Sequence, residues 1–115
     1  RGLSGGESPP EPIGRDELAA RLAEGSVTVL DVRPADEFAA AHIPGAINAR
    51  LADLEALAPT LRADATIVAY CRGPYCIYAD EAVAALRSLG LTARRLAGGV
   101  PEWRAEGRPV QSLVL

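Results

Sequence analysis

The chain has 115 residues, a formal net charge of −3 and 49% hydrophobic residues, which suits one domain around one core. Its twelve basic residues are all arginine, and they are too few and too well balanced by acids to form the basic face that nucleic acid requires. No apolar run is long enough to span a membrane, and no signal-peptide pattern is present.

The cysteine content argues against a disulfide-stapled scaffold and against a metal site. Only Cys71 and Cys76 are present, with four residues between them and a single histidine far away in sequence. This spacing is not that of common zinc or thioredoxin-like motifs. We therefore expect a cytoplasmic protein without a metal ion or another cofactor.

The first residues differ in composition from the rest. Residues 1–12 are rich in glycine, serine and proline, so we expect a flexible linker or tag remnant there and a single domain over residues 13–115. The sequence contains no methionine, even at position 1. We expect a processed chain or a segment of a longer protein.

Alternating strand and helix patterns follow. Leu18 and Leu22 lie one helical turn apart and predict a helix over residues 14–24, which Gly25 ends. Two short apolar runs, 27–30 and 66–70, predict buried strands. The pattern also predicts a brief helix over 36–41 anchored by Phe38, a turn and short extended piece over 42–48, a helical stretch over 51–61 broken near Pro59, a helix from 77 to a stop at Gly90, a strand over 92–96 and a helix over 101–105.

Within the helix after residue 76, Val83 and Leu86 fall at helical spacing together with Ile77 and Leu89. Strands that alternate with helices predict an α/β fold with a mostly parallel sheet covered on both faces.

Cys71 occupies the most informative position in this pattern. It follows the second apolar strand and opens a short loop that leads to a helix. The unpaired amides and the dipole at a helix N-terminus favour an anion, so a thiol there ionises more readily. The alternative is that Cys71 is only a small buried hydrophobe. We favour a nucleophile at the carboxyl end of the sheet, where ligands of such folds bind.

Three motifs occur in order along the chain. They are Val29-Leu30-Asp31-Val32-Arg33-Pro34 through Glu37-Phe38 with His42-Ile43-Pro44-Gly45-Ala46-Ile47-Asn48, then Tyr70-Cys71 with its loop, then Gly98-Gly99 with Trp103, Gly107, Pro109 and Val110. Together they resemble the rhodanese (sulfurtransferase) family over roughly residues 12–110. The resemblance implies a five-stranded, mainly parallel sheet with helices on both faces.

The loop sequence Cys-Arg-Gly-Pro-Tyr-Cys departs from the commonest family pattern, because its sixth position is Cys76. It resembles a variant in rhodanese domains fused behind arsenic-type winged-helix repressors. The resemblance thus implies that the full-length protein carries a DNA-binding domain. The loop is also one residue shorter than that of the related phosphatases, which argues against a phosphatase or arsenate activity.

The resemblance implies a thiosulfate:cyanide type of sulfurtransferase that forms a persulfide on Cys71. Its partners are a small anionic sulfur donor and a thiol or cyanide acceptor. The implied substrate-binding loop is Arg72, Gly73, Pro74, Tyr75, Cys76 and Ile77. Arg72 is either a surface charge or a group that attracts the donor, and Tyr75 either walls the pocket or is exposed.

Cys76 has three interpretations: an inert residue at the helix start, a resolving thiol that attacks the persulfide, or a soft-ligand partner. We expect a reduced resting state, with a disulfide only after oxidation or persulfidation. Asp31, Arg33 and His42 look like a charged triad, but the family resemblance implies structural support for the loops instead.

Two rival functions remain open. In the first, Cys71 and Cys76 report sulfane sulfur, oxidant or arsenical to a fused regulator without rapid turnover. In the second, the domain is an inactive scaffold, which the intact Cys71 argues against.

Overall fold

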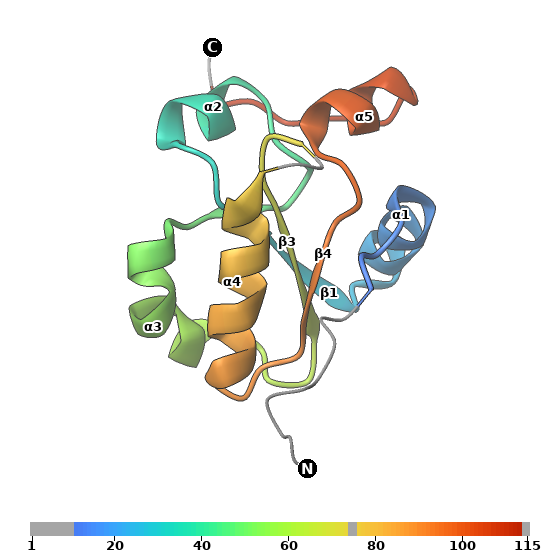
Figure 1. The fold of residues 1–115 in the computed structure, drawn as a ribbon. Helices are drawn as coiled ribbons and strands as arrows, with labels where there is room; N and C mark the ends of the chain where they lie inside the picture. Colours follow the sequence, from blue (N-terminus) through green and yellow to red (C-terminus); the bar gives the residue numbers. More distant parts are fainter. Residues whose placement is uncertain (1–10, 74–75, 114–115) are drawn as a thin grey trace.

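The computed structural model describes residues 11–73 and 76–113, and it has the predicted α/β architecture (Figure 1). Four parallel strands form one sheet in the order β2-β1-β3-β4. The strands are β1 (Val27–Asp31), β2 (Ile47–Asn48), β3 (Thr66–Tyr70) and β4 (Ala93–Arg95). The helices are α1 (Arg15–Glu24), α2 (Ala35–Ala40), α3 (Leu54–Leu57), α4 (Ile77–Ser88) and α5 (Val100–Ala105), with 3₁₀ turns η2 (Leu51–Asp53) and η3 (Ala58–Thr60) beside α3.

The central strands are in register along their full lengths. Val27 pairs with Thr66 at one end of the β1–β3 ladder, and Asp31 pairs with Tyr70 at the other. Because parallel strands finish at the same edge, the residues that follow Asp31 and Tyr70 leave the sheet side by side. The segments with Val32 and Cys71 therefore meet at the carboxyl edge.

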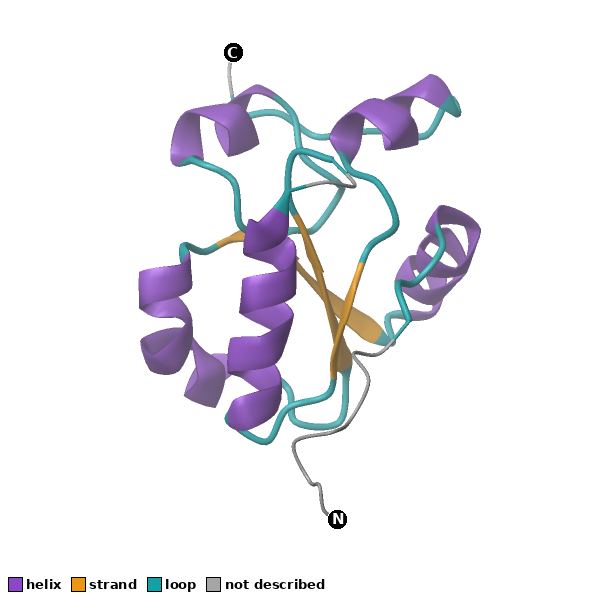
Figure 2. Cartoon of the chain, viewed as in Figure 1, coloured by secondary structure: helices purple, strands orange, loops and turns teal. Residues whose placement is uncertain are grey.

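Helices cover both faces of the sheet (Figures 1 and 2). One core joins alternate strand residues such as Leu30, Ile67 and Ala69 to the α3–α4 side, where Leu54 and Leu86 are buried. The other joins Val29, Val68 and Tyr70 to α1 and α5, with Leu18 and Trp103 buried there. This alternation follows from the two-residue period of a strand, and runs of apolar residues satisfy both faces at once.

The sheet has four strands in the described residues, where five were expected. A single parallel bridge between Ile13 and Leu96 extends it beyond β4, because the Ile13 amide donates to the Arg95 carbonyl and its carbonyl accepts from Ala97. Ile13 is fully buried, so it occupies the fifth position with one residue rather than with a full strand. The expected flexible segment lies mostly outside the described residues, and the domain limits stay a prediction.

The buried face of α4 differs from the predicted one. Val83 and Leu86 are buried as expected, but Ile77 and Leu89 are 61% and 44% exposed. Ala79 and Ala82 are fully buried instead, so small side chains let the helix lie close to the sheet. None of the helices in the described ranges is long and apolar enough to cross a membrane.

Candidate active site

Cys71 immediately follows β3 and belongs to the core on the α4 side. Its side chain is 2% exposed and packs with Val32 and Ala79. The preceding residue, Tyr70, points to the opposite face of the sheet. Strand alternation therefore assigns these two neighbours to different environments.

The loop after Cys71 returns to the start of α4 through Cys76. The Cys76 amide donates to the Gly73 carbonyl at 3.3 Å, and Cys76 itself precedes the first residue of α4. A disulfide joins Cys71 to Cys76, with Cα atoms 6.1 Å apart, which is within the range that disulfides need. The structure is therefore the oxidised form, whereas the expected resting state is reduced.

Two other segments hold this loop in place. The Arg95 guanidinium donates to the Gly73 carbonyl at 2.9 Å and to the Asp80 carboxylate at 2.8 Å. On the other side, Gly99 lies so close that an added Cβ would stand 2.7 Å from the Cys71 carbonyl oxygen. The segment that starts α5 thus supports the backbone of the cysteine directly, and only glycine fits there without a shift.

Arg72 points away from the core and forms an exposed ion pair with Glu37 of α2. Its Nε donates to both carboxylate oxygens at 3.0 Å, and a terminal nitrogen adds a third contact. The hydrogen bond from Arg72 is the main reason why the pKa of Glu37 is lowered, and the same bond raises the pKa of Arg72. The charge of Arg72 is thus neutralised locally.

Asp31 and Arg33 form a second ion pair, which is buried. Arg33 donates to Asp31 Oδ1 at 2.9 Å and to Oδ2 at 2.6 Å, and the Tyr70 hydroxyl donates to Oδ2 at 2.7 Å. Arg33 also donates to the Ala41 carbonyl, and the Ile43 amide donates to the Tyr70 hydroxyl. No buried side-chain nitrogen or oxygen in the described residues lacks a partner.

This burial affects the protonation of the network. Desolvation opposes the charge of Arg33, but the hydrogen bonds and charge of Asp31 outweigh it, so the pKa of Arg33 is raised. Burial, followed by the charge of Asp31, raises the pKa of Tyr70. The raised pKa values keep Arg33 charged as a guanidinium and Tyr70 neutral as a phenol.

His42 lies apart from this network. Its ring stacks on Phe38, with centroids 3.9 Å apart, and its Nδ1 lies 2.7 Å from the Phe38 carbonyl. Its backbone pairs with Gln111. These contacts favour the predicted structural role, because none of them joins the His42 ring to Cys71.

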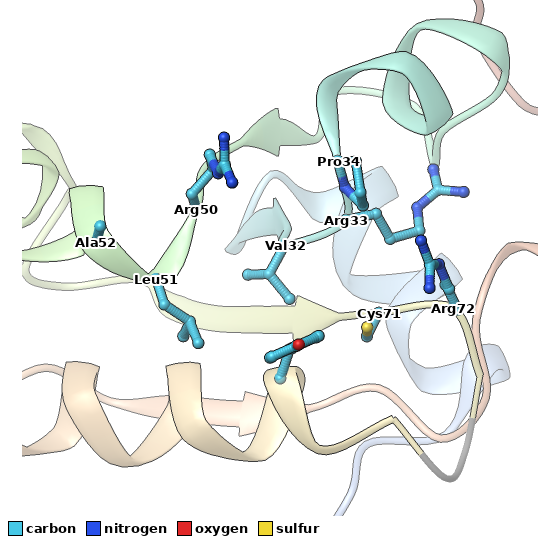
Figure 3. A pocket seen from close by; sticks show the side chains of 9 residues that line it. Val32, Arg33, Pro34, Arg50, Leu51, Ala52, Cys71 and Arg72 are labelled. Atoms are coloured by element: carbon cyan, nitrogen blue, oxygen red, sulfur yellow. The ribbon is translucent and has the colours of Figure 1, made fainter.

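A pocket of about 390 Å³ opens on the Cys71 side of the sheet edge (Figure 3). In Figure 3, Cys71, Arg72 and Arg33 lie at one side of the pocket, and Arg50, Leu51 and Ala52 lie across from them. Among the described residues, the lining consists of Val32, Arg33, Pro34, Arg50, Leu51, Ala52, Cys71, Arg72 and Tyr78. Cys71 thus borders a pocket that can hold a small ligand.

Only part of the predicted loop lines this pocket. Cys71 and Arg72 do, whereas Gly73, Cys76 and Ile77 are absent from the lining. Pro74 and Tyr75 lie outside the described residues. Within the described ranges, no group of three or more histidine, cysteine or acidic side chains is arranged to hold a metal ion.

Several site residues were not identified from sequence. Glu37 and Gly99 contact the loop from positions far away in the chain. The Gly98-Gly99 pair was a visible signal, as a turn and as part of the third family motif, but neither interpretation placed Gly99 against Cys71. Arg50, Leu51 and Tyr78 line the pocket, but no local pattern marks them as ligand-facing.

Comparison with known proteins identifies the class. The sequence matches the rhodanese-like domain family over residues 14–106, so the chain belongs to that family. A thiosulfate sulfurtransferase from Pseudomonas aeruginosa superposes with a TM-score of 0.81 and 30% identity, over 92% of this chain and 20% of that one. A rhodanese-related protein from Thermoplasma volcanium has a TM-score of 0.77 and 28% identity, over 91% of this chain and 100% of that one.

One relative of the chain is named as a transcriptional regulator and not as an enzyme. The HTH-type transcriptional regulator Rv0324 of Mycobacterium tuberculosis is 48% identical over 103 residues, which are 90% of this chain and 46% of the regulator. The chain thus spans less than half the length of that relative. The likeness agrees with the resemblance to rhodanese domains of repressor fusions.

Proposed function

We propose that the domain is a sulfurtransferase in which Cys71 accepts and passes on a sulfur atom. The observation that carries the proposal is the position of Cys71, which immediately follows β3, lines the pocket and opens the loop to α4. Membership of the rhodanese-like family and the name of the Pseudomonas relative support it.

The reaction requires the reduced protein, because a disulfide offers no thiolate. After reduction by a thiol, the Cys71 thiolate attacks the outer sulfur of thiosulfate. A sulfur–sulfur bond forms to Cys71, the bond within the donor breaks, and its electron pair leaves with sulfite. Cyanide or a thiol then attacks the outer sulfur of the persulfide and regenerates the thiolate.

The protein supplies position and charge for these steps. Gly99 and Arg95 hold the loop backbone, so the sulfur stays at the pocket. A persulfide-forming thiolate needs no proton acceptor for its attack, which agrees with the placement of His42 away from Cys71.

Thiocyanate release from thiosulfate and cyanide tests the proposal on reduced protein. Intact mass should increase by about 32 Da, one sulfur atom, after thiosulfate alone. A folded, reduced protein that gains no sulfur from any donor would falsify the proposal. The cytoplasmic setting and a fused DNA-binding domain are part of the same proposal and need the full-length protein.

A second candidate is a sulfur-, redox- or arsenical-sensing module of a regulator. Two observations favour it: the Cys71–Cys76 disulfide and the name of the mycobacterial relative. The Cys76 thiolate would attack the inner sulfur of the Cys71 persulfide, release hydrosulfide and close the disulfide. The oxidation of the pair would be the signal.

Turnover separates the two candidates. A sulfurtransferase continues to release thiocyanate, whereas a sensor without added reductant stops after about one equivalent. Cys76→Ser should still gain the sulfur, and its persulfide should last longer because no neighbouring thiol attacks it. Equal persulfide lifetimes in both proteins would leave Cys76 with a structural role only.

A further inference from the structure

We infer that the sulfur donor is an organic, singly charged sulfane sulfur compound rather than inorganic thiosulfate, an inference that rests on the proposed function of Cys71. Three observations carry it: the size of the pocket, the apolar character of its wall and the way its arginines are neutralised.

The pocket is larger than a small inorganic anion needs. Its volume of about 390 Å³ falls in the range of about 300–1,000 Å³ that is typical for organic ligands. Leu51 and Ala52 lie across the pocket from Cys71 (Figure 3), so a small ion at Cys71 would not fill the pocket. A donor with a carbon skeleton can reach both sides.

The wall is mostly apolar. The side chain of Tyr78 is about half exposed, at 51%, so its ring is free to contact a ligand, and an aromatic ligand can stack on it. Leu51 is partly buried against the α3–α4 core and presents its remaining surface to the pocket. The apolar lining consists of Val32, Pro34, Leu51, Ala52 and Tyr78.

The arginines that line the pocket match a ligand with a single negative charge. Arg33 is neutralised by Asp31, and Arg72 is neutralised by Glu37. Among the residues that the structure describes, Arg50 makes no ion pair. A dianion such as thiosulfate would lose more hydration than one uncompensated arginine restores, whereas a monoanion is matched.

Organic thiosulfonates provide the test. The Cys71 thiolate attacks the outer sulfur, the sulfur–sulfur bond of the donor breaks, and its electron pair leaves with the sulfinate. Methanethiosulfonate carries one charge and a small group, and benzenethiosulfonate carries one charge and an aromatic ring. Comparing thiosulfate with the first isolates charge, and comparing the first with the second isolates apolar contact.

The measurement is the rate of sulfur addition to Cys71 in reduced Cys76→Ser protein, followed by intact mass. Each rate is divided by the rate of the same donor with a free thiol, which removes intrinsic reactivity. We expect normalised rates that rise from thiosulfate to methanethiosulfonate to benzenethiosulfonate, with at least about a tenfold total increase.

Pocket variants locate the effect. Tyr78→Ala should lower the benzene-to-methane ratio about three- to tenfold, and Leu51→Ala should lower it in the same direction. Leu89→Ala removes an equally apolar exposed side chain at the far end of α4 and should leave the ratio unchanged. Tyr78 is exposed, so its variant should fold, and thermal unfolding checks all three.

Normalised rates that are equal for all donors, or highest for thiosulfate, overturn the inference while the sulfur-accepting function stands. The inference is also overturned if Tyr78→Ala and Leu51→Ala leave the ratio at the wild-type value. Failure of every donor to add sulfur to Cys71 overturns the proposed function itself.

Discussion

Tyr70 and Cys71 are consecutive residues, yet they lie in two opposite kinds of site. The Tyr70 hydroxyl belongs to a closed network in which Asp31 and Arg33 satisfy one another. Cys71 is nearly as buried, but its sulfur borders a pocket of about 390 Å³. Both sites contain charged groups next to the end of β3. The Tyr70 hydroxyl is buried within hydrogen bonds, whereas Cys71 lines the pocket, which Arg33 of the network also borders.

The comparison shows why charge is a poor guide to function at this edge. Arg33 and Asp31 are buried, paired and fully hydrogen-bonded, so their removal should act on stability. Arg72 is exposed and Glu37 is partly buried, and they pair beside the pocket, so their removal should act weakly on stability and more on ligand charge. The predictions below test this division.

The largest effect should come from Cys71→Ser. Serine keeps the size of the side chain but is a far weaker nucleophile, so sulfur transfer should fall by more than about 1,000-fold. Thiocyanate release and intact mass measure the loss, and thermal unfolding should stay close to that of reduced wild-type protein. Near-wild-type transfer by the folded variant would contradict the role of Cys71.

Asp31→Ala should act on the other site and mainly on stability. It leaves the Arg33 charge buried without its partner and removes the acceptor of the Tyr70 hydroxyl, which should cost about 3–5 kcal/mol. That is a large share of the typical stability of a domain, about 5–15 kcal/mol. Chemical denaturation measures it.

Tyr70→Phe is the milder companion of that variant. It removes two hydrogen bonds, one donated to the Asp31 carboxylate and one accepted from the Ile43 amide, and should cost about 1–3 kcal/mol. If Asp31→Ala unfolds at the wild-type denaturant concentration, the network is not a stabilising element and its role must be sought in the reaction.

Gly99→Ala should perturb the cysteine loop from outside. The new Cβ would meet the backbone oxygen of Cys71 at 2.7 Å, and backbone cannot move aside as a flexible side chain can. A displacement of the sulfur of this kind should lower sulfur transfer about 10- to 100-fold. Gly14→Ala is the matched control, because nothing lies within 4 Å of its added Cβ. Equal activities of the two variants would show that Gly99 does not position the loop.

The sequence predicts the fold well where the signal is local. The apolar runs of β1 and β3 and the position of Cys71 before a helix need only neighbouring residues to be recognised. The exposure of Ile77 was harder to predict. The helix α4 packs through Ala79 and Ala82, and alanine adds little to an apolar pattern. The expected fifth strand is only a single bridge between Ile13 and Leu96. Its length depends on how many residues pair at this edge of the sheet, which the local sequence does not show.

The position of Cys71 at the carboxyl edge of the sheet could be predicted from the sequence, but most of the residues around it could not. The partner of Arg72 lies 35 residues away in sequence, and Gly99 reaches Cys71 only because β4 returns the chain to the same edge. Such contacts follow from topology, so no spacing rule reveals them. The order of the three family motifs located the segments without showing which atoms meet.

The smallest effect should come from Glu37→Gln, which frees Arg72 without changing the shape of the site. The released charge should favour thiosulfate over methanethiosulfonate by about two- to fivefold relative to wild type, as expected for one exposed charge. The stability loss should be far below that of Asp31→Ala. Arg72→Gln is the reciprocal variant and should shift donor preference the other way; equal preferences in all three proteins would mean that this pair does not influence the pocket.

The pH dependence of that pair gives the last test. The pKa of Glu37 is lowered in the folded protein by Arg72, so the pair contributes stability at pH values above the ordinary pKa of about 4.3 for an unfolded glutamate. The contribution is lost as pH falls through the lower folded value, where Glu37 takes up a proton. The stability difference between wild type and Glu37→Gln should therefore be present at neutral pH and vanish in acid. A stability difference that grows as pH falls would contradict this, because it would mean that Arg72 does not stabilise the charged form of Glu37.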